Sequence, residues 1–478
     1  MMYIDLIILG PLAAILALVI PSNRWRPWLL PAAAMIHLSL VLAILTHHVR
    51  PEANGWLAID PPGRVVLLLI SVLFLICAFY TVGYLRYRAD HPNRIFCACL
   101  LTFLGSMSLV IITDNLGMMW VAMEATTLAT APLIYFNHTP QSLEATWKYL
   151  LMCSVGIALA LLGSFFMAYA AMLQGLAPSL SIPALLQQAP LLNPAWLKVG
   201  FVLLLVGYGT KMGLAPMHSW LPDAHGESPA PVSAMFSGAL ISSAFLMVAR
   251  SENILRAAGD GAFAARLLII LGVLSMLVAA IFIIGQKDLK RMLAYSSVEH
   301  MGILALGLGI GGIALVGAML HVINNGLSKG SLFLSVGNID LAYGGKTTDQ
   351  VQGAMRRLPL SGTVFLLGFL AITGSPPFGP FVSEFMILNG IFAAGHYLLG
   401  SAFVLLLLVI FLGMGRIVLS SVLGRPTVPG VKNAYREGFL RGLPVLLALL
   451  LVLLLGLYLP PPLRSLLNHA GTYLGMKP

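Results

Sequence analysis

Charged residues are scarce in this sequence: Asp, Glu, Lys and Arg make up 9% of its 478 residues, against roughly 25% in an average soluble domain. Hydrophobic residues account for 59%. This composition excludes a soluble globular protein. Apolar runs long enough for a hydrocarbon core of about 30 Å recur from the N-terminus almost to the end. They predict an all-α polytopic membrane protein.

Cysteine is scarce as well. The four cysteines, Cys77, Cys97, Cys99 and Cys153, all fall within predicted spans, where a free thiol usually packs as a small hydrophobe. They predict neither a disulfide framework nor a metal site. The sequence also lacks a Walker loop, a dinucleotide fingerprint in a βαβ setting, a CxxC pair and a nucleophile elbow. We expect no cofactor in this chain, so that any energy must reach it through partners.

The net charge of +10 does not indicate a nucleic-acid partner, because the lysines and arginines are scattered in short loops, as membrane topology requires. With the N-terminus outside, most of them fall in loops assigned to the cytoplasm. The bias predicts a multi-pass protein of a bacterial-type cytoplasmic (inner) membrane with its N-terminus outside.

Apolar runs, read against Gly, Pro and charged residues, predict about fourteen spans. The uncharged, proline-rich connection from Gln174 to Leu197 predicts a short interfacial helix or loop. The spans are expected near residues 3–20, 27–47, 64–84, 95–113, 115–136, 147–174, 196–216, 231–249, 264–285, 293–311, 313–341, 360–391, 400–421 and 443–460.

Two spans contain the same kind of interruption. Gly213 and Pro216 interrupt the seventh span, and Gly374 and Pro377 interrupt the twelfth with the same spacing. In each, an aromatic residue follows, with a carboxylate three residues later. Proline in such a helix frees carbonyl groups that protein, polar side chains or water must satisfy. Broken helices at corresponding positions of two halves indicate an inverted-repeat transporter, although two ordinary proline kinks are the alternative.

Two ionisable residues in the first half stand out, because such a group costs at least about 2.5–3.5 kcal/mol at mid-span unless it finds a partner or water. Glu124 lies midway along the fifth span, with Thr126 and Thr127 as nearby hydroxyl partners. Lys211 lies just before the first interruption, and Glu124 is its expected partner. A carboxylate that approaches or retreats would switch a buried lysine between holding and releasing a proton. The alternative is a static buried ion pair.

The second half supplies Lys329 and, just after the second interruption, Glu384. His321 lies about two helical turns before Lys329, on nearly the same face. A histidine can relay protons near neutral pH, whereas a membrane histidine taken alone is more often a packing residue. The lysine in the same span favours the relay.

His218 and His225 flank a polar segment after the first interruption. They could form the water-accessible mouth of a proton path or lie in a cytoplasmic loop without a role. Their spacing is too loose to predict a metal site.

The motifs resemble the antiporter-like membrane subunits of respiratory complex I, Mrp-type cation/proton antiporters and membrane-bound hydrogenases. Within that family the chain is most similar to the hydrogenase-4 component F type. The resemblance is strong from about Asp114 to Leu388. The motifs that carry it are Trp120-x3-Glu124, Gly209-Thr-Lys-Met-Gly-Leu-Ala-Pro-Met-His-Ser-Trp220, Asp288-Leu-Lys-Arg-Met-Leu-Ala-Tyr-Ser-Ser-Val-Glu-His-Met-Gly302, the Lys329 segment and Pro376-Pro-Phe-Gly-Pro-Phe-Val-Ser-Glu384.

The resemblance implies two inverted five-helix repeats with a broken helix in each. It divides the chain into N-terminal helices (1–94), a first repeat (95–249), a second repeat (262–421) and a C-terminal loop and helix (422–478). Ser242 stands where complex I relatives usually carry a lysine, and Asn325 replaces a second family histidine. We therefore expect Ser242, Ser243, the two histidines or water to connect the halves.

The functional hypothesis is proton translocation within a redox-driven complex of the complex I or group 4 hydrogenase type. Its partners would be other membrane subunits, a soluble redox module and the lipid bilayer. Glu124 and Lys211 would form the first switch, and Lys329, His321 and Glu384 the second. The alternatives are a non-pumping scaffold that docks a hydrogenase, formate or inorganic-carbon uptake module, and a Na⁺/H⁺ antiporter subunit.

Overall fold

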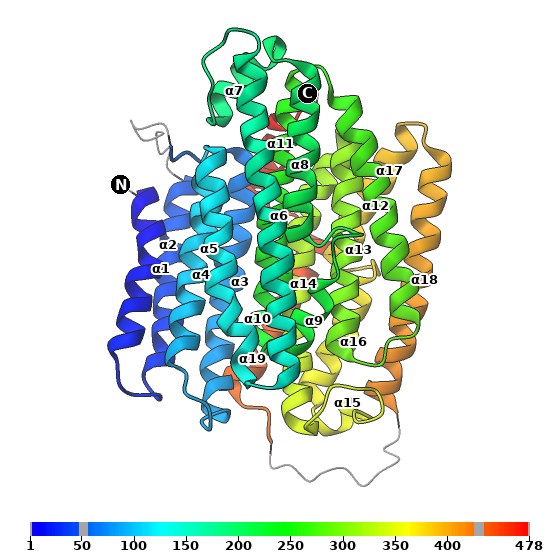
Figure 1. The fold of residues 1–478 in the computed structure, drawn as a ribbon. Helices are drawn as coiled ribbons and strands as arrows, with labels where there is room; N and C mark the ends of the chain where they lie inside the picture. Colours follow the sequence, from blue (N-terminus) through cyan, green and yellow to red (C-terminus); the bar gives the residue numbers. More distant parts are fainter. Residues whose placement is uncertain (1, 47–55, 425–434, 477–478) are drawn as a thin grey trace.

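The computed structural model of the chain is a bundle of helices (Figure 1). It describes residues 2–46, 56–424 and 435–476. Within these ranges no β-strand forms, and only isolated β-bridges join loops. Eleven helices of the described chain are long and apolar enough to cross a membrane. The prediction of an all-helical, multi-span protein is therefore confirmed.

The first half of the bundle alternates long helices with short connections. Its elements are α1 (Met2–Val19), η1 (Arg26–Trp28), α2 (Leu29–Thr46), α3 (Pro61–Tyr87), α4 (Arg94–Ile112), α5 (Leu116–Ile134), η2 (Tyr135–Asn137), α6 (Pro140–Met172), α7 (Ile182–Gln188), η3 (Ala189–Leu191), α8 (Pro194–Met212), α9 (Trp220–Glu227), α10 (Ala230–Met235), the π-helical turn η4 (Phe236–Leu240) and α11 (Ile241–Ala257).

The second half contains the 32-residue helix α14, most of which is buried, and two shorter helices that follow one another in the chain, α16 and α17. Its elements are α12 (Gly261–Ile284), α13 (Leu289–Ile310), α14 (Gly312–Tyr343), α15 (Ala354–Arg357), α16 (Pro359–Ile372), α17 (Gly379–Ala393), α18 (Tyr397–Leu423), α19 (Phe439–Leu457) and α20 (Pro461–Tyr473).

Each predicted span overlaps a helix of the described chain. The largest shift at the start of a helix is in α6, which begins seven residues earlier than predicted, at Pro140, because Thr139 caps it. The Ser142 N–H donates to Thr139 Oγ1 at 3.0 Å, and the Thr139 N–H donates to Ser142 Oγ at 2.9 Å. A polar first turn of this kind lies outside any apolar run. Part of the predicted C-terminal unit, residues 425–434, lies outside the described residues, as does residue 47 of the second predicted span.

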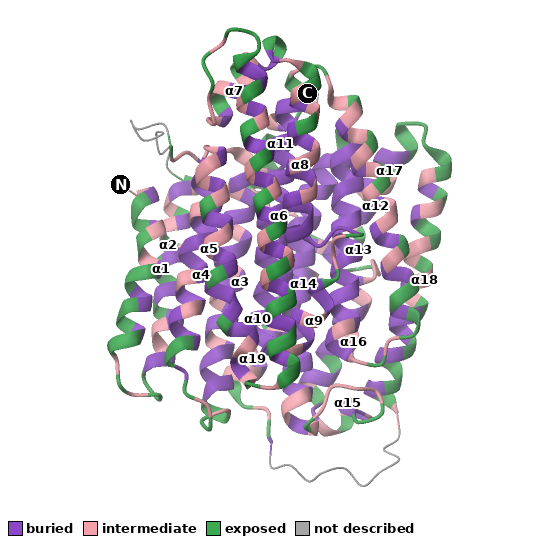
Figure 2. Cartoon of the chain, viewed as in Figure 1, coloured by how far each residue is buried: buried purple, intermediate pink, exposed green. Residues whose placement is uncertain are grey.

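The residues inside the bundle are mostly buried, and the outward faces of the outer helices are exposed (Figure 2). The exposed faces are apolar, whereas the interior also contains polar side chains. The outward faces of α1, α12 and α18 expose large apolar side chains such as Leu12, Ile281 and Leu405. By contrast, the segment from α10 through η4 to α11 is buried from Ala230 to Leu255. The outer surface suits lipid contact, whereas the polar groups of α11, α13 and α14 lie inside.

Glycines bring α6 and α8 close together. A Cβ on Gly207 would lie 2.5 Å from the Gly156 carbonyl oxygen, and a Cβ on Gly163 would lie 2.7 Å from the Gly200 carbonyl oxygen. Small residues at such contacts let backbones approach, which is how helices pack where lipid replaces water. This contact holds the last turn of α8, which carries Lys211, against α6.

Arg250 connects three helices through hydrogen bonds. Its side chain is 2% exposed and forms a bidentate pair with Asp60, the N-cap of α3, at 2.8 and 2.9 Å. The guanidinium also donates to the carbonyls of Ile111 and Thr113 at the end of α4. One buried side chain therefore satisfies orphan carbonyls of α4 and connects α3, α4 and α11.

Candidate functional site

The first interruption separates α8 from α9, as predicted. Gly213 ends α8 in the left-handed conformation at φ 86°. The backbone groups that the break frees are satisfied by protein: the Ala215 N–H donates to Ser275 Oγ at 2.9 Å, and Trp220 Nε1 donates to the Thr210 carbonyl at 2.8 Å. Specific hydrogen bonds therefore stabilise the break, and the break sets where the helix that carries Lys211 ends.

Lys211 lies in the last turn of α8 and is fully buried. Its ammonium donates to Thr127 Oγ1 and to Tyr149 Oη, both at 2.8 Å, and lies 4.6 Å from the centroid of the Tyr149 ring. Thr127 comes from α5 and Tyr149 from α6. Two of the three ammonium donors are thus occupied by neutral hydroxyl groups rather than by a carboxylate.

Glu124 reaches Lys211 through Thr127. Its carboxylate accepts a hydrogen bond from Ser154 Oγ at 2.8 Å and one from Thr127 Oγ1 at 3.3 Å. Among the described residues no direct ion pair joins Glu124 to Lys211, but the two interact electrostatically and both bond to Thr127. Residues 124 and 127 share one face of α5, which places the threonine hydroxyl between the two charges. We call Glu124, Thr127, Tyr149, Ser154 and Lys211 the first polar cluster.

Thr126, the other hydroxyl expected near Glu124, points elsewhere. Its Oγ1 donates to the Met123 carbonyl at 2.6 Å within its own helix. Of the two adjacent threonines, only Thr127 takes part in the first polar cluster.

The second interruption separates α16 from α17, again as predicted. Glu384 follows it on α17, and its carboxylate packs against Gly374, where no Cβ would fit. Glu384 is 5% exposed, and its Oε1 has no hydrogen-bond partner. An unpartnered buried carboxylate oxygen of this kind calls for a proton, an ion or water.

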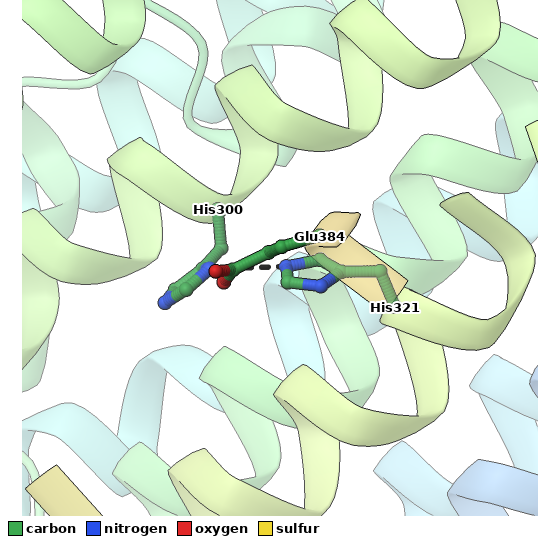
Figure 3. Close-up of side chains that lie close together, drawn as sticks. All are labelled: His300, His321 and Glu384. Carbon is green, nitrogen blue, oxygen red and sulfur yellow. Dashed lines mark hydrogen bonds between the residues drawn. The ribbon is translucent and has the colours of Figure 1, made fainter. Parts of the chain in front are cut away.

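Two histidines lie beside Glu384 (Figure 3). His300 Nδ1 and His321 Nε2 are 3.0 Å apart, and His321 Nδ1 is 2.9 Å from Ser383 Oγ. One ligand atom from each of His300, His321 and Glu384 lies within 4.8 Å of the other two. The three residues come from α13, α14 and α17, so that only the folded bundle brings them together.

Lys329 is fully buried on α14 and donates to the Leu293 carbonyl of α13 at 2.8 Å. Glu299 interacts electrostatically with it and accepts a hydrogen bond from Ser296 at 3.3 Å. We call Glu299, His300, His321, Lys329, Ser383 and Glu384 the second polar cluster. His321 and Glu384 thus meet as expected, whereas Lys329 contacts the backbone of α13 rather than either of them.

His225 lies between the two clusters: its ring is 5.9 Å from that of Phe236, which stacks on Tyr149 of the first cluster, and it interacts electrostatically with Lys329 of the second. It is fully buried on α9, its ring stacks on Phe333 at 4.9 Å, and neither ring nitrogen has a hydrogen-bond partner. The alternative of a loop residue is therefore wrong for His225. His218 lies in the break itself, with its ring 6.3 Å from that of Tyr295.

The expected linking residues form no hydrogen bond to either cluster within the described chain. Ser242 and Ser243 donate to the carbonyls of Gly238 and Ala239, four residues back in their own segment, at 2.8 and 2.9 Å. Asn325 is buried, and neither polar atom of its amide has a hydrogen-bond partner. Their role in connecting the halves stays a prediction.

Sequence reasoning assigned no role to several members of the clusters. Tyr149 and Ser154 are common residue types within apolar helices and gave no local signal. Glu299 and His300 did give one, because both are ionisable groups inside the predicted span 293–311. An inventory of every buried ionisable residue would have included them.

The described chain is a bundle of membrane-crossing helices, and two spans are interrupted beside buried lysine, histidine and glutamate side chains. These features define a class of multi-span membrane proteins with ionisable groups in their interior. The family described as NADH:quinone oxidoreductase/Mrp antiporter, TM, matches residues 113–411. This match covers more than half of the chain. The chain belongs to this family.

Relatives and solved structures agree with this assignment. A hydrogenase-4 component F homolog from Methylacidiphilum infernorum is 33% identical over 482 residues, which cover 98% of this chain and 99% of the relative. A chain of respiratory complex I from Thermus thermophilus, 27% identical, superposes with a TM-score of 0.77 over 96% of this chain and 97% of its own. A chain of an archaeal membrane-bound sulfane sulfur reductase, at 23% identity, matches in fold with a TM-score of 0.89 over 99% and 98%.

The resemblance inferred from the motifs is therefore confirmed for the family and for the likeness to hydrogenase-4 component F. By their names, the two solved structures are of respiratory complexes.

Proposed function

We propose that this chain is a proton-translocating membrane subunit of a redox-driven complex of the complex I or group 4 hydrogenase type. Its membership in the NADH:quinone oxidoreductase/Mrp antiporter family and its likeness to a hydrogenase-4 component F homolog support the type of complex. The two polar clusters support the transport of protons in particular, since hydroxyl, imidazole, ammonium and carboxyl groups can all pass a proton along hydrogen bonds.

The observation that carries the proposal is the hydroxyl of Thr127 between Glu124 and Lys211. It accepts from the ammonium at 2.8 Å and lies 3.3 Å from the carboxylate. A buried ammonium held by two neutral hydroxyls depends on the nearby carboxylate for charge compensation. A change in the protonation or position of Glu124 is thereby felt at Lys211.

In the second half, Lys329, His321 and Glu384 would form the second switch, with Glu299 and His300 as additional members. His218 and His225 would lie on the route between the clusters, with Ser242, Ser243 and Asn325 or water completing it. His225 supports this route because it is buried between the clusters with both ring nitrogens free of protein partners in the described chain.

The finer architecture belongs to the same proposal. The chain would cross a bacterial-type inner membrane about fourteen times, with its N-terminus outside. Residues 95–249 and 262–421 would be two inverted repeats, which the breaks between α8 and α9 and between α16 and α17 support. Neighbouring membrane subunits would connect the chain to a soluble redox module, and the chain itself would hold no cofactor.

Replacing Lys211 with Met in the intact complex tests the proposal. We expect redox-driven proton uptake into proteoliposomes to fall sharply, because the variant cannot hold a proton at the end of α8. Lys198→Met is the matched control, since Lys198 is paired with Asp260 outside both clusters. Uptake by Lys211→Met at the wild-type rate would remove Lys211 from the mechanism.

The same vesicles address the alternatives. Uptake that persists without Na⁺ favours proton translocation over Na⁺/H⁺ antiport. A complex that turns over its substrate but moves no proton, even in the wild type, would instead support the scaffold.

A further inference from the structure

We propose that His300, His321 and Glu384 form a binding site for one Zn²⁺ ion. The three side chains converge from α13, α14 and α17 (Figure 3), with one ligand atom of each within 4.8 Å of the others. Binding of the ion to these residues does not depend on the proposed function, although any effect on proton transfer does.

The donor set favours a particular class of ion. Two imidazoles and one carboxylate, with a fourth position open to water, are a common ligand set of Zn²⁺. Mg²⁺ and Ca²⁺ prefer sites built from oxygen alone. The cluster therefore selects a borderline-soft divalent transition ion.

Hydrogen bonds around His321 suit the tautomer that such a ligand needs. Ser383 Oγ can donate its single proton to a backbone carbonyl of its own helix, that of Pro380 at 3.0 Å or that of Gly379 at 3.4 Å, and accepts from Asn324 Nδ2 at 3.3 Å. With its proton on a carbonyl, the hydroxyl accepts from His321 Nδ1, 2.9 Å away. His321 Nε2 keeps its lone pair, and it faces His300 and Glu384. A partner that fixes the tautomer of a ligating histidine is typical of metal sites.

The distance between the imidazoles nearly fits an ion. Two nitrogens at about 2.05 Å from a tetrahedral Zn²⁺ lie about 3.3 Å apart, and the observed separation of His300 Nδ1 and His321 Nε2 is 3.0 Å. A shift of about 0.3 Å opens the site, with the His300 proton moving to Nε2. His300 Nε2 and Glu384 Oε1 are buried polar atoms without a hydrogen-bond partner.

Charge and access are compatible with an ion. The negative charges of Glu384 and the nearby Glu299 would offset the positive charges of Zn²⁺ and of Lys329. The Glu384 carboxylate packs against Gly374 in the break between α16 and α17, where Pro376 and Pro377 are exposed. Glu384 is 5% exposed at this break, whereas His300 and His321 are fully buried.

Co²⁺ titration of the tag-free, metal-stripped full chain in lipid nanodiscs tests the site, because Co²⁺ replaces Zn²⁺ and absorbs visible light. We expect one equivalent per chain, with the absorption lost when Zn²⁺ is added. His300→Gln, His321→Gln and Glu384→Gln should each weaken binding by at least about 100-fold, and Ser383→Ala by about 10- to 100-fold.

His37→Gln is the matched control, since His37 is a buried histidine held by Ser71 and Ser108 away from the cluster. Co²⁺ binding that survives in all three ligand variants overturns the proposal. X-ray absorption of the Zn²⁺-loaded wild type keeps the test independent of how the variants fold. A first shell with two imidazoles and one carboxylate supports the site, and a shell of oxygen or sulfur alone refutes it.

Discussion

Thr127→Val isolates the hydroxyl that joins the two charges of the first polar cluster. The change keeps the shape of the side chain but removes the acceptor of one of the two hydrogen bonds that hold Lys211. A hydrogen bond to a charged group contributes about 1.5–3 kcal/mol, equivalent to about 10- to 150-fold in the population of the connected arrangement. If protons pass between Glu124 and Lys211, we expect proton uptake to fall at least about tenfold.

The assay is redox-driven proton uptake by the intact complex in proteoliposomes, measured beside its electron-transfer rate. Thr126→Val is the matched control, because it removes a hydroxyl from the neighbouring position that bonds only within α5. Thr127→Ser should restore uptake, since it returns the hydroxyl. If Thr127→Val pumps as well as the wild type, the connection through Thr127 has no role in transport.

Three further changes test the fold. Asp60→Asn should lower the free energy of unfolding by about 3–5 kcal/mol, because it leaves the charge of Arg250 buried without its partner; an unchanged thermal transition would contradict this. Gly207→Ala should cost about 1–3 kcal/mol through the contact of α6 with α8, whereas Gly209→Ala, whose nearest neighbour would lie 3.4 Å away, should cost nothing measurable. Lys287→Cys, with the native cysteines replaced, should react with an impermeant maleimide in inside-out vesicles only; labelling in intact cells would reverse the proposed orientation.

The positions of the helices could be predicted because a span must be apolar over a fixed length. Predicted and observed helices differ mainly at their ends, as at Pro140, where a capping residue extends α6 beyond the apolar run. The short helix α20 was not predicted, since its sequence is too polar for a span. The breaks at Gly213 and Gly374 were found because glycine and proline affect the backbone locally.

Contacts between helices were harder to predict. The sequence suggested that Glu124 and Lys211 meet, but it did not indicate which atoms lie between them. His300 shared no motif with His321 or Glu384, and its place beside them depends on how α13, α14 and α17 pack. Periodicity assigns a residue to a face of its own helix and says nothing about which helix covers that face.

Three properties of the chain follow from the amino-acid sequence alone: that it is a helical membrane protein, where its helices are interrupted, and which buried ionisable groups need partners. Composition and local backbone chemistry decide these properties, and both can be read along the chain. The packing of the helices was needed to show that Thr127 separates Glu124 from Lys211, that Lys329 bonds to the backbone of α13, and that two histidines and a glutamate converge. These arrangements depend on distances of a few ångströms between segments far apart in the sequence, which the packing of the whole bundle sets.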